Sequence, residues 1–367
     1  MIQFSDEQAM LLDTALDFCR NQSPIDTVRD RLDAEHIDRE QWQQIVELGW
    51  LGINAPETSG GLGMGLSSVV PIVESMGRYL MGTPYSSTVL AIETLAANGS
   101  EAQQAEWLPR LAAGGIATMA LTEADGGWNL KDIEARGFVD SGRVRLEGKK
   151  TFVTDADVAD FLLASVQIDG AARFVLIETG ALRVVERETV IDQTRRSFQV
   201  SLDGVEIDSG QVLSGADFDR VEQAALLLLT AEAAGGLPSV LHLVVEYLNT
   251  RKAFGRTIGS YQALKHPAAD ILLSSEAARS HLYHAATLFD KDDVRAREAA
   301  VRMAKAQAVE AFAYAGDRAV QFHGGFGFTF ECDAQLFLRR ALWCQYQFGD
   351  ERYHRQLLQP LLLDAAG

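Results

Sequence analysis

The spacing of apolar side chains changes twice along the chain and divides it into three parts. Up to residue 117, apolar residues recur every three or four positions, as they do on the buried face of amphipathic helices. Between 118 and 217 the period falls to about two, in short runs rich in β-branched residues that Gly, Asp and Ser separate. Helical spacing then returns and continues almost to the end. We therefore predict an α+β fold with an N-terminal helical domain (1–117), a middle antiparallel β domain (118–217) and a C-terminal helical bundle domain (218–367).

The sequence between Val244 and Ile271 predicts two helices joined at an exposed corner. The first helix is expected to end near Arg251 and the second to begin near Ser260, with glycines between them. The corner carries the cations Arg251 and Arg256, the aromatic Phe254 and a glycine. Guanidinium groups bind phosphate oxygens in pairs, and a glycine lets the backbone come close to a ligand. This composition suits a pyrophosphate and a flat ring, while the alternative is a helix corner with solvated arginines.

Composition narrows the class of protein. The 33 basic and 51 acidic residues give a net charge of −18, which argues against a nucleic-acid or anionic membrane surface. Cys19, Cys332 and Cys344 lack the spacing of metal ligands, so we expect free thiols, no metal site and a cytoplasmic protein. The acidic, amphipathic N-terminus predicts no signal or transit peptide. No strand leads into a Gly-x-Gly-x-x-Gly turn and a helix, which excludes the usual nicotinamide dinucleotide-binding unit.

The corner motif resembles that of the acyl-CoA dehydrogenases, flavoenzymes that desaturate acyl thioesters between the α and β carbons. The matching positions are Arg251-x-x-Phe254-Gly255-x-x-Ile258-Gly259-x-x-Gln262-x-x-x-His266. The loop Pro56-Glu57-x-x-Gly60-Gly61-x-Gly63 is similar to a second loop of that family. The order of a helical part, a β part and a helical part also matches, and the resemblance implies that the C-terminal domain is a four-helix bundle.

The resemblance implies an FAD cofactor that neighbouring subunits share. In the family, the residue at Arg251 reaches the FAD pyrophosphate of a neighbour, and those at Phe254 and Gln262 line the adenosine side. The glycine-rich loop that begins at Gln321 resembles the family loop that meets the neighbour's FAD through Gly324 and Gly325. A tight glycine turn with exposed amides is well suited to a pyrophosphate. We therefore expect a dimer or tetramer.

Two threonines at predicted strand ends are the expected contacts for the flavin ring. Thr122 matches the threonine that bonds the flavin pyrimidine edge in the family, and Thr154 matches the one whose hydroxyl approaches N5. Phe152 stands where a tryptophan is usual and keeps an aromatic side chain beside the ring. The chain departs from the family at Trp128, where a small hydroxyl residue is usual.

Neither position at which the family keeps its catalytic carboxylate holds one here. Phe348 occupies the position of the usual Glu, and the position used by a second branch falls on Ala225 or Leu226. Glu222 and Glu232 lie on the same helical face as that second position, which makes them the local candidates for the base.

The sequence therefore predicts an FAD-dependent dehydrogenase of acyl-CoA thioesters that passes electrons to an electron-transfer flavoprotein or a similar acceptor. Because it lacks the usual base, the chain resembles subunits of the heteromeric acyl-CoA dehydrogenases of bacterial steroid and aromatic-acid catabolism. This resemblance implies a paralogous partner subunit. A homo-oligomer that uses Glu222 or Glu232 is the alternative enzyme. The rival from another class is a non-catalytic structural subunit, and a third hypothesis is a flavin oxidase or nitroalkane-type enzyme on the same fold.

Overall fold

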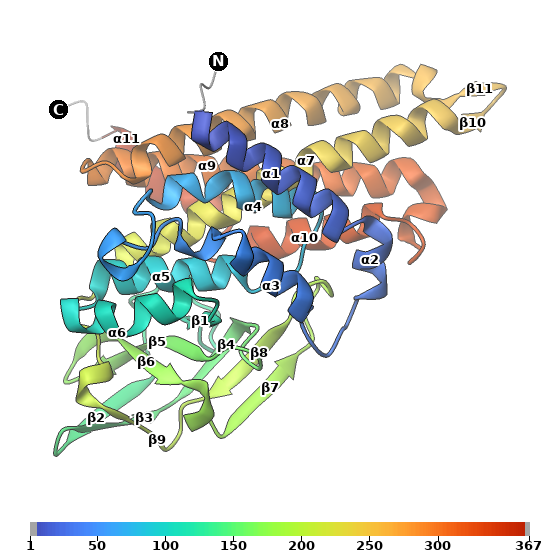
Figure 1. Ribbon diagram of the computed structural model, residues 1–367. Coiled ribbons are helices and arrows are strands. Elements are labelled where there is room, and N and C mark those ends of the chain that lie inside the picture. Colours follow the sequence, from blue (N-terminus) through green and yellow to red (C-terminus); the bar gives the residue numbers. More distant parts are fainter. Residues whose placement is uncertain (1–5, 364–367) are drawn as a thin grey trace. The chain divides into compact units, whose positions relative to one another are not determined.

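The computed structural model describes residues 6–363 (Figure 1). It contains two compact units. The first holds the described residues up to Leu32, the segment Val70–Met81 and the chain from Leu226 onward, and the second holds Asp33–Val69 and Gly82–Ala225. The helix α7 (Phe218–Thr250) belongs to both units.

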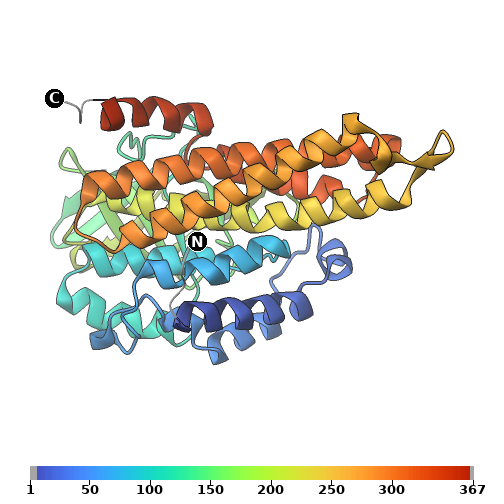
Figure 2. The ribbon, with the colours of Figure 1, turned by 90° about the horizontal axis from the view of Figure 1, so that it is seen from above.

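The first unit is a helical bundle. Its other helices are α1 (Asp6–Gln22), α2 (Ile25–Asp30), α4 (Val70–Arg78), α8 (Gln262–Phe289), α9 (Val294–His323), α10 (Ala334–Tyr346) and α11 (Glu351–Leu363). The helix α9 packs against α8, α10 and α11, and α1 packs against α4. Figure 2 shows α8 and α9 side by side, in agreement with the contacts between them.

The length and composition of α7 would allow it to cross a membrane, but its packing identifies it as a core helix. Its most apolar window is 78% buried inside the structure. Close approach to α4 explains two glycines. A Cβ on Gly235 would lie 1.9 Å from the carbonyl oxygen of Glu74, and one on Gly77 would lie 2.1 Å from that of Glu232. The two helices therefore touch backbone to backbone, which fixes the place of Glu232 in the bundle.

The second unit combines helices with two sheets. Its helices include α3 (Arg39–Glu47), α5 (Tyr85–Asn98) and α6 (Glu101–Ala112). Its strands are β1 (Ala117–Ala120), β2 (Arg136–Asp140), β3 (Arg143–Glu147), β4 (Lys149–Thr154), β5 (Phe161–Ile168), β6 (Ala171–Glu178), β7 (Val184–Glu188), β8 (Ser197–Ser201) and β9 (Val205–Asp208). One sheet has the order β1-β5-β2-β3-β9, with β6 also paired to β5, and the other has the order β4-β8-β7.

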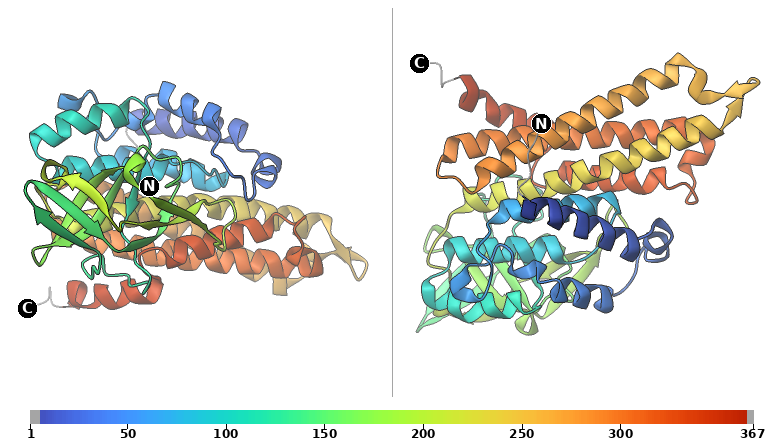
Figure 3. Two further views of the ribbon diagram at one scale, coloured as in Figure 1. Left: turned by 90° about the horizontal axis from the view of Figure 1, so that it is seen from below. Right: turned by 45° about the horizontal axis from the view of Figure 1, so that its top comes forward.

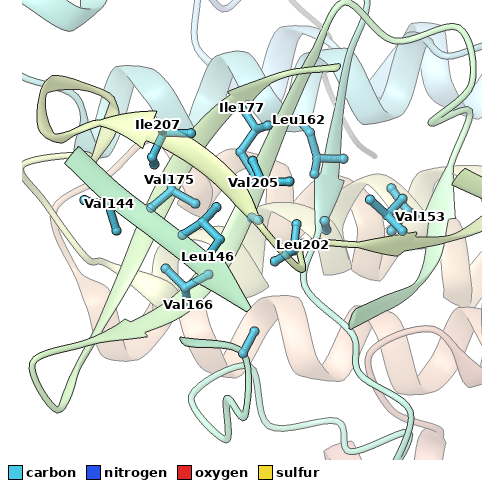
Figure 4. Packing of buried hydrophobic residues seen from close by; sticks show 14 of the residues in the cluster. Val144, Leu146, Val153, Leu162, Val166, Val175, Ile177, Leu202, Val205 and Ile207 are labelled. Atoms are coloured by element: carbon cyan, nitrogen blue, oxygen red, sulfur yellow. The ribbon is translucent and has the colours of Figure 1, made fainter. Parts of the chain in front are cut away.

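The side chains between the strands form one apolar core. It includes Val144, Leu146, Val166 and Val175, all buried, and Figure 4 shows them pointing toward one another. Alternate residues of β3, β5, β6, β8 and β9 face this core, which explains the period of two in the sequence.

The structure corrects the prediction of a purely antiparallel β domain. Most neighbouring strands are antiparallel, but β5 pairs in parallel with both β1 and β2. Parallel strands need a long crossover connection, and the strands β2 to β4 supply it between β1 and β5. The predicted α+β order of elements is confirmed, because strands replace helices between Ala112 and Ala117 and helix returns at Phe218. The three domain boundaries stay predictions, because compactness groups the chain into two units.

Candidate active site

The predicted helix corner is present as a short hairpin. The helix α7 ends at Thr250, the strands β10 (Lys252–Ala253) and β11 (Arg256–Thr257) pair, and α8 begins at Gln262. Both central residues of the turn, Phe254 and Gly255, have positive φ (52° and 79°), as a type I′ turn requires. Figure 3 shows this hairpin at the end of the long helices α7 and α8.

The side chains of the corner are available to a ligand or a partner. Phe254 is 95% exposed. Arg251 is exposed, and within residues 6–363 its guanidinium makes no ion pair or hydrogen bond. Arg256 differs, because its guanidinium lies over the ring of Tyr261 at 4.0 Å. Gln262 is exposed at the first turn of α8.

The glycine-rich loop lies beside the start of this corner. Gly324 begins the short helix η7 (Gly324–Phe328), and a Cβ on Gly324 or Gly325 would meet no atom within 4 Å. The ring of His323 stacks on Tyr247, one turn of α7 before Arg251, with ring centroids 4.0 Å apart. Its Nδ1 lies 2.7 Å from the carbonyl oxygen of Ala319. His323 is therefore a packing residue that joins the glycine loop to the corner, and Gln321 is exposed next to it.

The structure also brings Thr122, Phe152 and Thr154 close together at the ends of β1 and β4. The amide of Thr151 donates to the carbonyl of Thr122 at 2.9 Å, and Thr118 Oγ1 donates to the carbonyl of Thr154 at 2.6 Å. The pairing of β4 with β8 shifts between Lys150 and Val153. Phe152 lies in this bulge with φ 54°, an uncommon conformation for a bulky residue, and its ring is exposed.

The available groups suit a flat ring joined to a pyrophosphate. The hydroxyls of Thr122 and Thr154 hold no hydrogen bond within the described part of the chain, so both can donate to a ring. The exposed aromatic ring of Phe152 stands beside them. In the other unit, the guanidinium of Arg251 and the open backbone at Gly324 and Gly325 suit phosphate oxygens. The donor types therefore match those that a flavin dinucleotide requires.

The two candidate bases have different surroundings. Glu232 is buried in α7, and Arg340 Nη1 donates to its Oε1 at 2.5 Å, with 0% and 5% of the two side chains exposed. Arg340 also contacts the carbonyl of Leu80 at 3.4 Å. A carboxylate held by a buried guanidinium is already engaged, which disfavours Glu232 as a proton acceptor. Glu222 is buried in the first turns of α7.

Phe348 lies in the turn between α10 and α11. It is half-buried with φ 55°, and Gly349 follows with φ 107°. The buried ammonium of Lys305, on α9, donates to the carbonyls of Cys344 and Gln347, the latter at 3.0 Å. Asp350 then begins α11 by accepting from the amide of Tyr353 at 2.8 Å. Sequence reasoning missed Lys305 and Arg340; a lone lysine among alanines in α9 was the available signal.

Beneath this turn, His354 gives the protein a predictable response to acid. It is fully buried, and burial first, then the charges of Lys305 and Arg302, lowers its pKa to about 3. The unfolded chain binds a proton near pH 6.5, so stability is intact above pH 6.5 and falls as the pH drops toward 3. The expected loss is about 1.4 kcal/mol per pH unit within that window. Urea unfolding at several pH values measures it.

Two variants distinguish the effect of His354 from other causes of acid sensitivity. His354→Gln should flatten the dependence of the unfolding free energy on pH between 6.5 and 3. His284→Gln removes an exposed histidine of α8 and should leave it unchanged. If the unfolding free energy changed equally with pH in the native protein and both variants, His354 would not be the source of the acid sensitivity.

Comparison with known proteins identifies the family to which the chain is similar. The family models for the N-terminal and C-terminal domains of acyl-CoA dehydrogenases match residues 5–115 and 225–362. Acyl-CoA dehydrogenase FadE12 of Mycobacterium tuberculosis is 33% identical over 316 residues, which cover 81% of this chain and 80% of the relative. Isovaleryl-CoA dehydrogenase of Pongo abelii is 27% identical over 96% of this chain and 88% of its own length.

Solved structures show the same fold. The ChsE4-ChsE5 complex from Mycobacterium tuberculosis contains a chain with a TM-score of 0.89 and 25% identity, over 98% of both chains. Butyryl-CoA dehydrogenase from Megasphaera elsdenii has a TM-score of 0.89 and 23% identity, over 99% of this chain and all of its own. The chain belongs to the acyl-CoA dehydrogenase family and is an FAD-dependent oxidoreductase that acts on CH–CH bonds.

Proposed function

We propose that the chain works as one subunit of a hetero-oligomer that shares its flavin sites, and that a paralogous partner supplies the catalytic carboxylate. The reaction is the α,β-dehydrogenation of an acyl-CoA thioester. When bound, FAD supplies the hydride acceptor. Thr122 and Thr154 bond the edges of the flavin ring, and Phe152 lies beside it. Arg251, Phe254, Gln262, Gln321, Gly324 and Gly325 bind the dinucleotide end of a neighbour's flavin.

The observation that carries this proposal is that neither position 348 nor position 232 offers an available carboxylate. Removal of the α proton needs a base in contact with the substrate. Phe348 cannot accept a proton, and the carboxylate of Glu232 is engaged by Arg340. A partner with a Glu at the corresponding turn would complete the site.

Exposed aromatic side chains support the proposed assembly. Phe254, Phe328 and Phe330 are 95%, 76% and 60% exposed. Exposed large apolar side chains are typical of interaction surfaces, and all three lie in or just after the two loops that the proposal assigns to a neighbour's flavin. Similar structures include a ChsE4-ChsE5 complex from Mycobacterium tuberculosis and a variant of a Tcur3481-Tcur3483 steroid acyl-CoA dehydrogenase. We propose the same pairing of two different subunits for this chain. We also propose that its electrons pass to an electron-transfer flavoprotein or a similar acceptor.

Expression of the chain alone and with a paralogous subunit tests where the base lies. Loss of a positioned base costs roughly two to four decades in rate, so we expect the chain alone to be nearly inactive with acyl-CoAs and the pair to be active. In the pair, Glu222→Gln and Glu232→Gln should leave turnover intact once flavin content is normalised. A single chain that is active, and that one of these two substitutions inactivates, would assign the base to this chain instead.

A non-catalytic structural subunit is the second candidate, and Trp128 favours it. Its bulky indole is half-buried in the loop where the family keeps a small hydroxyl residue. Thr154→Val in the active pair distinguishes the two functions. The substitution changes this chain only and leaves the partner as it is. If the flavin facing Thr154 takes part in catalysis, turnover should fall. If the chain is structural, turnover should stay the same.

A further inference from the structure

The corner that carries Thr122 is tied to β4 at three points. The backbone of Thr151 donates to the carbonyl of Thr122 at 2.9 Å, and Thr151 Oγ1 donates to the carbonyl of Glu123 at 3.2 Å. Lys150 Nζ donates to Glu123 Oε1 at 2.6 Å. The bulge in β4 frees Thr151 from β8 and lets it pair with Thr122. Both proposed flavin threonines therefore depend on the same short segment of β4.

The carboxylate of Glu123 also closes the loop of residues 124–133. The chain leaves at Glu123 and returns at Glu134 and Ala135, whose amides donate to Oε2 and Oε1 of Glu123 at 2.7 and 3.0 Å. The loop between these points is mostly exposed and contains Trp128. One carboxylate therefore holds both ends of the loop and the lysine of β4 at the same time.

Stability alone does not explain an ion pair at this place. The side chains of Lys150 and Glu123 are 0% and 6% exposed, so both charges are buried. The further partner of the ammonium is Ser165 Oγ at 2.9 Å. Removing two charges from water costs about as much as their attraction returns, so the attraction between Lys150 and Glu123 adds little net stability. A buried ion pair instead specifies one arrangement of the segments that it joins.

We propose that Glu123 and Lys150 are positioning residues for the flavin: together they set the direction of the Thr122 hydroxyl and hold the 124–133 loop closed beside it. The inference rests on the proposed flavin contact of Thr122. It goes further because it assigns a role to two residues that do not themselves touch the flavin. Its consequence is that Lys150 controls flavin affinity through Thr122.

Flavin titration of the apoprotein, prepared from the assembled holoprotein, tests this with a two-residue cycle. Lys150→Met should weaken FAD binding about tenfold, the effect of one lost positioned contact. Thr122→Val should weaken it to a similar degree in the native background. If Lys150 acts through Thr122, the Thr122→Val effect should largely disappear in the Lys150→Met background, because the hydroxyl is already misplaced.

Trypsin provides the readout for the loop. Lys131 is exposed within the 124–133 loop, and opening of the loop should make cleavage after Lys131 faster in Lys150→Met. The double variant Glu123→Gln/Lys150→Met leaves no unpaired buried charge, so it keeps the fold, yet it still deprives one loop amide of its acceptor. It should show the same faster cleavage and the same weaker flavin binding. Lys149→Met makes the same change at the exposed neighbour and should alter neither.

The outcomes are distinct. Additive effects of Lys150→Met and Thr122→Val, or faster cleavage at all sites rather than after Lys131, would reduce Glu123 and Lys150 to structural residues and overturn the inference while the flavin contact stands. An unchanged FAD affinity in Thr122→Val would overturn both the contact and the inference.

Discussion

Phe348→Glu gives the isolated chain a turnover with acyl-CoA that the native chain lacks. The substitution places a carboxylate where the family keeps its base, on a turn that Lys305 and the start of α11 already hold in place. Phe348 is half-buried with a positive φ, and glutamate needs no more room there than phenylalanine. A positioned base contributes roughly two to four decades in rate. Turnover of the flavin-loaded single chain with an artificial electron acceptor measures the gain.

The control is Phe348→Gln, which has nearly the same shape as glutamate but cannot accept the proton. It should remain as inactive as the native chain. Equal activity in the Glu and Gln variants would contradict the assignment of position 348, as would a native single chain that is fully active with Phe348 present.

Arg251→Ala weakens FAD retention strongly and leaves the flavin-free protein as stable as before. The side chain is exposed and has no partner within residues 6–363, so its removal takes nothing from the fold. A lost charge-assisted contact to a phosphate costs about 1.5–3 kcal/mol, or roughly one to two decades in affinity. Arg251→Lys should restore little, because an ammonium cannot form the paired contact. FAD titration and the melting temperature of the apoprotein measure the two quantities.

Lys252→Ala is the matched control, since it removes the same charge from the next residue of the hairpin. A comparable loss of FAD in both variants would indicate a general effect of charge. Unchanged flavin content in Arg251→Ala would show that Arg251 is only a solvated residue of a helix corner and does not bind FAD.

Local features of the fold were predictable because local chemistry produces them. The helix end at Thr250 and the start of α8 at Gln262 agree with the predicted corner, where glycines and clustered cations interrupt the helical period. The pairing of strands was harder to predict from the sequence. The pattern of β5 is that of a buried strand, but only the fold decides that its neighbours β1 and β2 run parallel to it.

The same difference between local and long-range features holds for the candidate site. Motifs identified Thr122, Thr154, Arg251 and the glycine loop, because each occupies a turn whose residues are adjacent in sequence. The engagement of Glu232 by Arg340 joins residues more than a hundred positions apart, and nothing in either local sequence indicates it. The Glu123–Lys150 pair was missed for the same reason, because a buried charge becomes visible only with its partner.

The visible absorption spectrum of the purified assembly is the most direct test that this chain is an FAD-dependent acyl-CoA dehydrogenase. The chain, expressed with a paralogous subunit and reconstituted with FAD, should show the absorption bands of bound flavin, and these should bleach when acyl-CoA is added without oxygen. A protein that remains colourless after reconstitution with FAD and partner would contradict the account.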